Sequence, residues 1–360
     1  MTDADLRLEP LIAPERLDGP DAAPFRRMVE LNNIVCRHDT GHDGLAQEVE
    51  DLWGLWRDTA DWQRLGIAAW AGDELVGVST FTVSTQPGTA TAEYDLIVDP
   101  DRWGEGAETA LVDASEAEAR RRGLRSLQTW TLHRADAPGE RMQPSTGWGS
   151  IPADRHAALL HARGYALEQV ERTSAFDLHG SFDRVERMLA DAVSDMGDGY
   201  DRVHWTGATP DAYLEAFAYA ISRMSTDAPQ GGLDVEEQHW DADRVRRRDA
   251  RQAAQGLTTS VAAVVHRATG AIVAFNELAI GADRTAATWQ YGTLVLSEHR
   301  GRRLGTVVKC DNLLRWRTIA PESPRITTFN AEENRPMLSI NEALGFFAVS
   351  WAGAWKKVLD

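Results

Sequence analysis

Residues 297–305 form a loop rich in arginine and glycine, and these residue types suit the binding of a phosphate group. The run before the loop, residues 291–296, is apolar and β-prone, which predicts a strand. From Leu304 onward the apolar residues recur at helical spacing, which predicts a helix. A helix begins with backbone N–H groups that lack an intrahelical acceptor, and its dipole is positive at that end. This strand, loop and helix therefore predict an anion site.

The loop also supplies side chains that fit this chemistry. Gly305 has no side chain, so a ligand can approach the backbone closely there. Guanidinium groups make charge-assisted hydrogen bonds to phosphate oxygens. The loop carries three such groups, on Arg300, Arg302 and Arg303.

The segment Arg300-Gly301-Arg302-Arg303-Leu304-Gly305 resembles motif A of the GNAT superfamily of N-acetyltransferases, Arg/Gln-x-x-Gly-x-Gly/Ala, which binds the pyrophosphate of acetyl-CoA. Arg300 and Gly305 match this motif, whereas Arg303 replaces its middle glycine. The resemblance implies that the loop N–H groups bind pyrophosphate, and that the preceding strand end offers backbone groups to the pantetheine arm and the thioester carbonyl. The acetyl-CoA-binding residues expected on this basis are Leu294, Val295, Leu296, Arg300, Gly301, Arg302, Arg303, Leu304, Gly305, Thr306 and Asn334.

Asn334 belongs to a second match, in residues 334–346, which resemble the late helix and strand of the family, Asn-x-x-Ala-x-x-Leu-Tyr-x-x-x-Gly-Phe. Asn334, Gly345 and Phe346 match this pattern. In the family the asparagine contacts the CoA arm, and the tyrosine often protonates the departing thiolate. Asn341 stands in the tyrosine position, and an amide has no acidic proton near neutral pH. The resemblance therefore leaves the general acid missing or supplied from elsewhere.

The chain has 360 residues, of which 43% are hydrophobic, and this suits a globular protein of two domains. Its N-terminus has neither the basic head nor the apolar run of a secretory signal, and no apolar run approaches membrane-spanning length. The two cysteines, Cys36 and Cys310, favour a reducing compartment over a disulfide framework or a zinc site. We therefore expect a cytoplasmic protein without a bound metal.

The net charge of −17 disfavours nucleic acid or an anionic membrane as a partner. The same charge would attract a cationic small molecule such as an amine, although solubility alone would also explain it. The expected partner is thus a small-molecule amine substrate. The sequence leaves open whether the chain forms a homodimer.

The chain contains an internal repeat, because residues 95–109 align without gaps on residues 292–306. The flanking strand and helix patterns repeat in the same order. Together with the resemblance, this predicts an α/β (α+β) protein with two tandem GNAT-like domains, each a mixed, mostly antiparallel sheet flanked by helices. The expected domains are residues 1–179, with a degenerate CoA loop, and residues 199–360, which bind acyl-CoA. Residues 180–198 would link them.

The repeat also indicates which half binds CoA. The N-terminal loop has different residues where the C-terminal loop has Arg300, Arg302, Arg303 and Gly305; these are Trp103, Glu105, Gly106 and Glu108. Two carboxylates beside a pyrophosphate would each cost about 1 to 4 kcal/mol at 4 Å and intermediate dielectric. We therefore expect that the N-terminal domain does not bind CoA and closes one side of the acceptor pocket. An independent vestigial domain is the alternative.

The sequence offers several candidates for the general base. Glu277 is the preferred candidate, because a carboxylate within an otherwise apolar strand is expected to hold a proton more readily than an exposed one. A place on the solvated face of the sheet is the alternative for Glu277. His239 is a second candidate, although a histidine beside Trp240 is more often structural. His299 is expected to neighbour CoA, and the terminal carboxylate of Asp360 is a weaker candidate.

The sequence therefore predicts an acyl-CoA-dependent N-acyltransferase that uses acetyl-CoA and transfers its acyl group to a small, cationic amine by direct attack in the C-terminal domain. A non-catalytic protein that binds acyl-CoA or another ligand is the main alternative. A protein-lysine acetyltransferase and an O-acetyltransferase also fit the fold. No residue identifies the acceptor.

Overall fold

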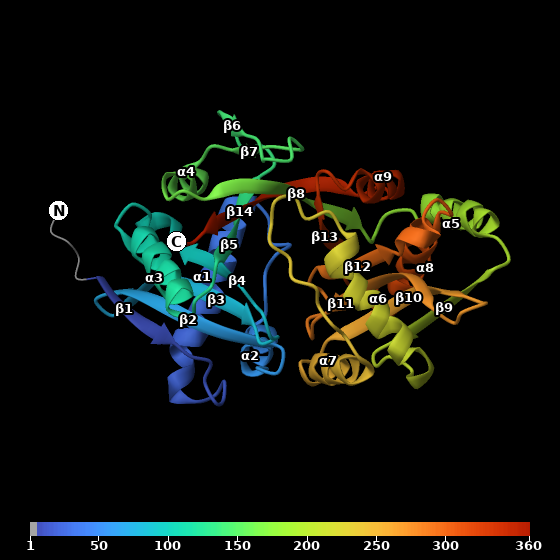
Figure 1. Cartoon of the computed structure of the whole chain (residues 1–360), viewed down its shortest axis with the longest axis horizontal. Helices are drawn as coiled ribbons and strands as arrows, with labels where there is room; N and C mark the ends of the chain where they lie inside the picture. Colours follow the sequence, from blue (N-terminus) through green and yellow to red (C-terminus); the bar gives the residue numbers. More distant parts are fainter. Residues whose placement is uncertain (1–5) are drawn as a thin grey trace. The chain divides into compact units, whose positions relative to one another are not determined.

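The structure is a computed structural model, and it describes residues 6–360 (Figure 1). The chain forms two compact units that are not consecutive along the sequence. The N-terminal unit holds residues up to Arg172 together with Gln230–Asp234 and Val349–Asp360. The C-terminal unit holds Thr173–Pro229 and Val235–Ala348. The units are defined by packing rather than by the repeat, so the predicted domain limits stay a prediction.

The N-terminal unit is a mostly antiparallel sheet with helices. Its strands follow the order β1-β2-β3-β4-β5-β14-β8, in which the last strand of the chain pairs with β5 from Ser350↔Arg134 to Val358↔Ser126. Its elements are β1 (Leu6–Leu11), the 3-10 helix η1 (Pro20–Ala22), α1 (Ala23–Thr40), α2 (Val49–Arg57), β2 (Trp62–Ala71), β3 (Glu74–Ser84), β4 (Thr91–Val98), η2 (Pro100–Arg102), α3 (Ala107–Arg121), β5 (Ser126–Arg134), β6 (Arg141–Met142), β7 (Ile151–Pro152), α4 (Arg155–Ala162), β8 (Ala166–Asp177), which ends in the other unit, and β14 (Phe347–Val358), which begins there.

The C-terminal unit repeats this plan with the strand order β13-β12-β11-β10-β9. Its elements are α5 (Asp183–Met196), β9 (Tyr200–Thr206), η3 (Asp211–Tyr213), α6 (Leu214–Asp227), α7 (Ala242–Ala254), β10 (Thr258–His266), β11 (Ile272–Ile280), β12 (Thr288–Val295), η4 (Ser297–His299), α8 (Leu304–Ile319), β13 (Arg325–Ala331) and α9 (Arg335–Leu344). The helix α5 lies in the stretch that was expected to be a linker. It packs on α8, since Val185 shares a core with Leu313 and Trp316.

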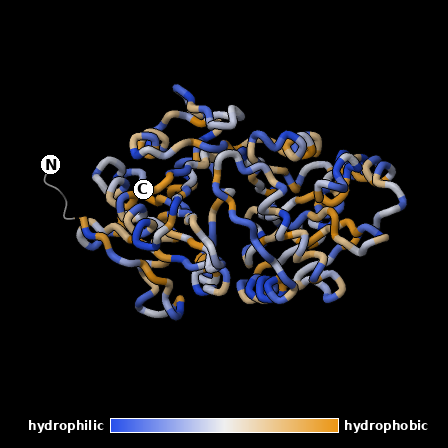
Figure 2. Tube along the Cα trace, viewed as in Figure 1, coloured by the Kyte–Doolittle hydropathy of each residue, from blue (hydrophilic) through white to orange (hydrophobic). Residues whose placement is uncertain are grey.

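Strand β11 is the centre of the C-terminal unit, because all of its residues are buried. Successive side chains of a strand point to opposite faces of the sheet. Asn276 and Leu278 meet α8, whereas Phe275 packs edge-on against Phe217 of α6. The helices α8 and α6 therefore cover opposite faces. In Figure 2, apolar residues are frequent in the strands of both units, and the helices carry apolar and polar residues together.

The predicted repeat is present element by element. The series β4, η2, α3 of the N-terminal unit corresponds to β12, η4, α8 of the C-terminal unit. The backbone of the two loops also corresponds, because Gly104 and Gly301 have positive φ angles of 94° and 81°. At the next such position Gly106 has φ 101° and Arg303 has φ 54°. The expected fold class, a mixed α/β protein with two tandem domains of this kind, is confirmed.

Candidate active site

The N-terminus of α8 in the C-terminal unit is open to an anion. Its N-cap residue is Arg303, no side chain caps it, and its first turn carries no acidic residue. The N–H groups of the first turn therefore keep their hydrogen-bonding capacity for a ligand. Arg303 has the left-handed conformation that glycine adopts most readily, which explains why the family motif has glycine at this place.

The loop arginines have partners within the unit. The Arg300 guanidinium donates to the carbonyl oxygens of Val295 (3.2 Å) and Asp227 (3.1 Å), so it ties the loop to the end of β12 and to α6. Arg303 forms an exposed ion pair with Asp195 (2.9 Å). Arg302 is exposed and lies over the ring of Tyr200 at 5.8 Å. The expected phosphate contacts of these side chains stay a prediction.

Strands β12 and β13 run parallel and separate after a short paired stretch. They pair only at Thr288↔Ile326 and Trp289↔Thr327. The register of the two strands ends at Trp289, so residues 290–295 of β12 lie beyond this paired stretch. The backbone groups on this edge can receive an extended ligand in the way that a sheet edge receives another strand. Leu294 and Leu296 are buried, so the backbone is what this strand end can offer.

A β-bulge lies beside this separation. The pairing of β11 with β12 shifts between Asn276 and Leu278, so Glu277 lies opposite the extra residues Tyr291 and Gly292. A bulge breaks the regular ladder and turns backbone groups into new directions. The preferred base candidate therefore lies directly opposite the irregular part of β12.

Glu277 is buried rather than solvated, and it has a partner that the sequence did not reveal. Its carboxylate forms an ion pair with Arg248 of α7, whose guanidinium lies 6.0 Å from the centre of the Phe217 ring. The surroundings of Glu277 are thus cationic as well as apolar. His239 lies exposed on the loop before α7, where its carbonyl oxygen accepts from Arg244 (2.6 Å). The base assignment to Glu277 or His239 stays a prediction.

The late-motif asparagines have mainly local contacts. Asn334 caps α9, because its side chain accepts a hydrogen bond from the Met337 N–H (3.4 Å). Asn341 is buried and donates to the Asn330 side chain of β13 (2.7 Å), and its own Oδ1 has no hydrogen-bond partner. The match of Asn341 to the family's tyrosine stays a prediction.

Sequence reasoning missed a buried polar network under this region. Lys309 of α8 is fully buried, and its ammonium donates to Gln290 Oε1 on β12 (2.7 Å). Burial lowers the pKa of Lys309 to about 7. Gln290 donates in turn to Thr328 Oγ1 on β13 (2.8 Å) and accepts from Asn276 Nδ2 (3.1 Å). The only sequence signal was a lysine within an apolar run of the helix.

The N-terminal unit differs at each of these points. Strands β4 and β5 stay paired over four positions, from Thr91↔Ser126 to Tyr94↔Thr129, so only residues 95–98 of β4 lie beyond the paired stretch. The pairing of β3 with β4 is regular from Gly77↔Val98 onward and contains no bulge. The N-terminal unit thus has a shorter free strand edge and a regular ladder beside it.

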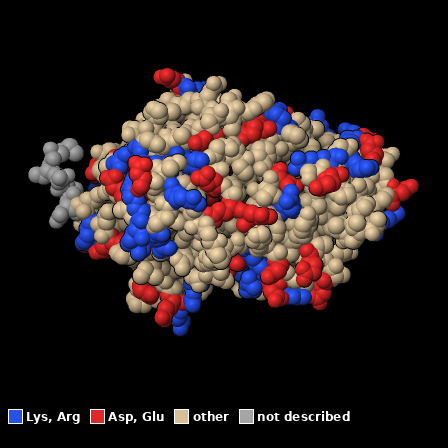
Figure 3. Space-filling view, in the orientation of Figure 1, with Lys and Arg blue, Asp and Glu red and all other residues tan. Residues whose placement is uncertain are grey.

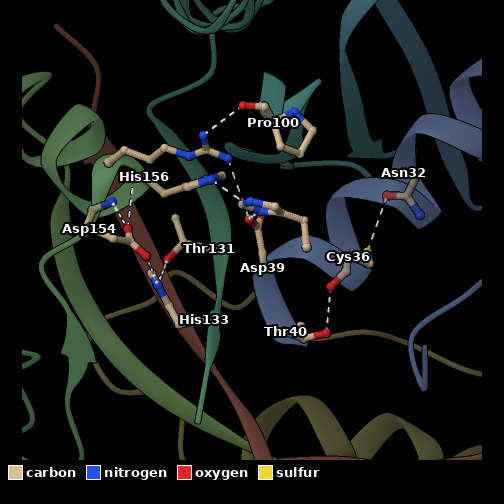
Figure 4. Close-up of polar contacts among 12 residues, drawn as sticks. Asn32, Cys36, Asp39, Thr40, Pro100, Thr131, His133, Asp154 and His156 are labelled. Atoms are coloured by element: carbon tan, nitrogen blue, oxygen red, sulfur yellow. Dashed lines mark hydrogen bonds and ion pairs between the residues drawn. The ribbon is translucent and has the colours of Figure 1, made fainter. Parts of the chain in front are cut away.

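Its loop is occupied by side chains of the unit itself. Trp103 stands in the place of Arg300 and packs against His156 of α4, with the ring centres 4.4 Å apart. Arg155 lies over the same indole at 4.7 Å. His156 Nε2 lies 3.5 Å from Asp39, as Figure 4 shows, and burial lowers the pKa of this histidine.

The two carboxylates of the N-terminal loop are separated from each other. Glu105 is exposed and pairs with Arg102 (2.7 Å). Glu108, in the first turn of α3, is buried, and its Oε2 has no hydrogen-bond partner. A negative charge at a helix N-terminus competes with a phosphate for the same N–H groups and the same dipole. This supports the expectation that the N-terminal loop is unsuited to pyrophosphate.

Figure 4 also shows a second group of hydrogen-bonded side chains near His156. His133 is buried and bridges Thr131 Oγ1 (2.7 Å) and Asp154 Oδ2 (2.7 Å). Asp154 at the same time caps α4 through the His156 and Ala157 N–H groups. Trp355 of β14 donates to Thr131 (2.9 Å), so this group fixes the final strand in the N-terminal unit.

Two general features concern the described residues as a whole. Within residues 6–360, no group of three or more His, Cys, Asp or Glu side chains is arranged to hold a metal ion. None of the described helices combines the length and the apolar character needed to cross a bilayer.

On the face shown in Figure 3, acidic and basic side chains both occur on each unit, so the net charge of −17 does not make that face uniformly acidic.

Comparison with known proteins gives a family match for part of the chain. Residues 30–142 match the family model of the acetyltransferase (GNAT) family. This match lies in the half whose loop carries Glu105 and Glu108. A search of curated proteins gave no match.

Several solved structures resemble this chain over almost its whole length. A tandem GNAT protein from the clavulanic acid biosynthesis pathway is 23% identical, covers 99% of both chains and has a TM-score of 0.72. A GCN5-related N-acetyltransferase from Sphaerobacter thermophilus is 13% identical, with 98% of this chain and 96% of that chain covered and a TM-score of 0.59. A glucosamine N-acetyltransferase region of a fungal β-N-acetylglucosaminidase is also 13% identical, with coverages of 98% and 38% and a TM-score of 0.58. The chain therefore has the tandem GNAT fold, and its N-terminal half carries the sequence pattern of the GNAT acetyltransferase family.

Proposed function

We propose that this protein is an acyl-CoA-dependent N-acyltransferase whose C-terminal unit transfers an acetyl group from acetyl-CoA to a small, cationic amine. The observation that carries this proposal is the part of β12 beyond its pairing with β13, which leads from the uncapped N-terminus of α8 to the bulge opposite Glu277. The uncapped helix N-terminus suits a pyrophosphate, and the strand edge suits an extended chain with amide groups.

The length of this edge fits the donor. The pantetheine arm spans about four residues of extended chain, because its amide-containing backbone has about twelve bonds and each residue contributes three. Val295 lies beside the loop, and Tyr291 lies four residues before it, about 13 Å away at the rise of a strand. A CoA with its pyrophosphate on α8 would therefore bring its thioester to the bulge. The free edge of β4, residues 95–98, is shorter than this path.

The chemistry required at the bulge is direct attack. The amine nitrogen forms a bond to the thioester carbon, the C–S bond breaks, and a proton from the amine ends on the CoA thiol. Backbone N–H groups turned by the bulge would polarise the carbonyl. Glu277 is the proposed base, and Arg248 would fix its orientation. The net charge of −17 favours a cationic acceptor.

The test is an acyl-transfer assay with acetyl-CoA and a panel of small amines, in which release of free thiol and the mass of the product are both measured. We expect amine-dependent thiol release by the wild-type protein and none by Gly305→Glu. Acetyl-CoA binding without transfer to any amine would support the non-catalytic alternative. Products acylated on a hydroxyl would identify an O-acetyltransferase. Acylation of protein lysines alone would identify a protein-lysine acetyltransferase.

The proposed base is tested within the same assay. Glu277→Gln should lower kcat by about 100-fold, in the range of general base catalysis, and should leave the affinity for acetyl-CoA unchanged. His239→Gln is the matched variant, since it tests the other candidate on an exposed loop. A fall in kcat that occurs only in His239→Gln would identify His239 as the base.

A further inference from the structure

Lys309 is the least expected buried group in the C-terminal unit. It has 0% exposure, yet among the described residues no carboxylate acts on its charge. Its contacts are the hydrogen bond to Gln290 Oε1 (2.7 Å) and the ring of Phe346, whose centre lies 5.3 Å from the amine. A buried ammonium without a counter-ion is strongly unfavourable. An amine kept there at such a cost suggests a role outside folding.

The fold itself does not need an amine at this position. Helices α3 and α8 begin at Ala107 and Leu304, so Val112 is the N-terminal counterpart of Lys309. Val112 is fully buried and lies in an apolar cluster. The same core position is therefore filled by an ordinary apolar side chain in the other half of the molecule.

The amine is connected to the place where β12 and β13 part. Gln290 and Thr328 lie one residue beyond the last paired positions of the two strands, and the Gln290 amide bridges them (2.8 Å). Lys309 holds the other end of that amide. The three side chains thus form a chain from α8 through β12 to β13, at the end of the path that the pantetheine arm would follow.

The hydrogen bonds among Lys309, Gln290 and Thr328 leave the three side chains short of an acceptor. The Thr328 hydroxyl accepts from Gln290, so its own proton remains available, and an ammonium at Lys309 has N–H groups beyond the one used by Gln290. The network therefore has more donors than acceptors. A ligand atom that is negative or has a lone pair would balance it, and the sulfur of CoA becomes such an atom when the C–S bond breaks.

We propose that Lys309 is a positioning residue of the C-terminal site, which fixes Gln290 and Thr328 at the thioester end of bound CoA and lowers the energy of the CoA thiolate through its positive charge. This inference rests on the proposed function. Lys309 gives up no proton in the reaction, since the proton that the thiolate receives comes from the acceptor amine. Such a charge contributes to catalysis because it acts on the transition state and product more than on the neutral thioester.

The pKa of Lys309, about 7, fits this role, because the amine can carry its charge near neutral pH once the thiolate is beside it. The charges that face it are few. Cys310 is its neighbour on α8, and its thiol has a pKa raised by burial to about 12, so it stays neutral. The strands β12 and β13 contribute the neutral side chains Gln290 and Thr328, and the late segment after α9 contributes the ring of Phe346.

The experiment measures the ionisation of the thiol of CoA bound to the protein, by thiolate absorbance across neutral pH. The variants are Lys309→Met, which removes the charge at similar length, Lys309→Arg, which keeps it, and Cys310→Ala, a buried neighbour outside the network. We expect the bound thiol of the wild type to have a pKa about one unit lower than that of Lys309→Met, a tenfold change in thiolate. Lys309→Arg should restore part of this shift, and Cys310→Ala should match the wild type.

The same variants are then compared in acyl transfer. Lys309→Met should lower kcat by about tenfold while the KM for acetyl-CoA changes little. Equal thiol pKa values in wild type and Lys309→Met would overturn the inference, even if transfer proceeds normally. Failure of the wild type to bind CoA would overturn both this inference and the proposed function, whereas binding with a shifted thiol and no transfer would overturn the proposed function alone.

Discussion

The two halves of this chain contain the same three consecutive elements. In each half a strand, a 3-10 turn and a helix follow one another, and the loop backbone has positive φ at corresponding residues. The halves differ in what surrounds the helix N-terminus. The C-terminal half has Gly305, a bulge and a long free strand edge, whereas the N-terminal half has Glu108, a regular ladder and a short edge.

Under the proposed function, this difference separates the fold from the ligand site. The loop keeps its backbone path with glycine or arginine at the N-cap, because tertiary packing determines that conformation. Anion binding needs free N–H groups and room beside them, and a single side chain can remove both. The family match over residues 30–142 is thus compatible with a half that has kept the fold and lost the donor site.

The largest effect is expected when the N-terminal residue is placed in the C-terminal loop. In Gly305→Glu, the new Cβ would lie 3.1 Å from Ile340 Cδ1, and a carboxylate would occupy the helix N-terminus. We expect the affinity for acetyl-CoA to fall by about 100-fold or more, a loss of about 3 kcal/mol. Isothermal titration calorimetry measures this change.

The reverse substitution is its control. Glu108→Gly should not create a second site, because Trp103 still packs against His156 and β4 still pairs with β5 as far as Tyr94. Calorimetry on Glu108→Gly, with Gly305→Glu present to remove the C-terminal site, should show no binding. Clear binding there would mean that one side chain, rather than the strand geometry, separates the two halves.

A second comparison concerns the core position that holds Lys309 in one half and Val112 in the other. Burial lowers the pKa of Lys309 from 10.5 to about 7, so the folded state binds this proton less tightly than the unfolded state. Below pH 7 the full cost of burying the charge applies; between pH 7 and 10.5 it declines, and above that it vanishes. Lys309→Met should therefore raise the free energy of unfolding by roughly 4 kcal/mol near pH 7.

Urea unfolding at several pH values checks this prediction. The gain of Lys309→Met over wild type should shrink as pH rises from 7 toward 10.5. Cys310→Ala, at an equally buried position, should lose stability at all pH values through its smaller volume. A Lys309→Met protein that is less stable than wild type at pH 7 would identify the lysine as a structural residue.

Arg300→Ala tests how the C-terminal loop is held. Its guanidinium bonds to Val295 and Asp227, so its removal should loosen the loop against β12. We expect acetyl-CoA affinity to fall by about tenfold, the value of one or two such hydrogen bonds. Arg267→Ala removes an exposed arginine that pairs with Asp201 on another hairpin, and should leave the affinity unchanged. Equal effects of both substitutions would point to general charge rather than to the loop.

The smallest effect concerns the loop backbone. Arg303 adopts a left-handed conformation with φ 54°, which costs a residue with a side chain about 1 kcal/mol. Arg303→Gly should therefore gain up to about 0.5 kcal/mol in stability, the strain relief being partly offset by chain entropy. Gly106→Ala, at φ 101°, should lose about 1 kcal/mol. Thermal unfolding of the two variants measures both, and a loss by Arg303→Gly would show that the side chain stabilises the loop.

Local patterns predicted a large part of this structure. The strand, the loop and the helix around Gly305 follow from spacing and composition, and the repeat follows from gapless alignment. Contacts between distant residues were not predictable. The ion pair of Glu277 with Arg248 joins a strand to a helix earlier in the chain. The sequence around either residue gives no sign of this contact. The burial of Lys309 was likewise hidden, because a lysine at one helical position usually reaches solvent.

The extent of strand pairing was also beyond the sequence. The residues of β4 and β12 around the separation are similarly β-prone, yet β4 stays with β5 for two positions longer than β12 stays with β13. No local pattern in either strand distinguishes the two cases. The extent of pairing is nevertheless the feature on which the assignment of the donor site depends.

The most direct measurement counts acetyl-CoA molecules bound per chain by native mass spectrometry of the purified protein. We predict one bound acetyl-CoA in the wild type and in Glu108→Gly, and none in Gly305→Glu. Two molecules per chain in the wild type, or one that persists in Gly305→Glu, would contradict the assignment of the donor site to the C-terminal unit. No bound acetyl-CoA in the wild type would show that neither half has kept the site.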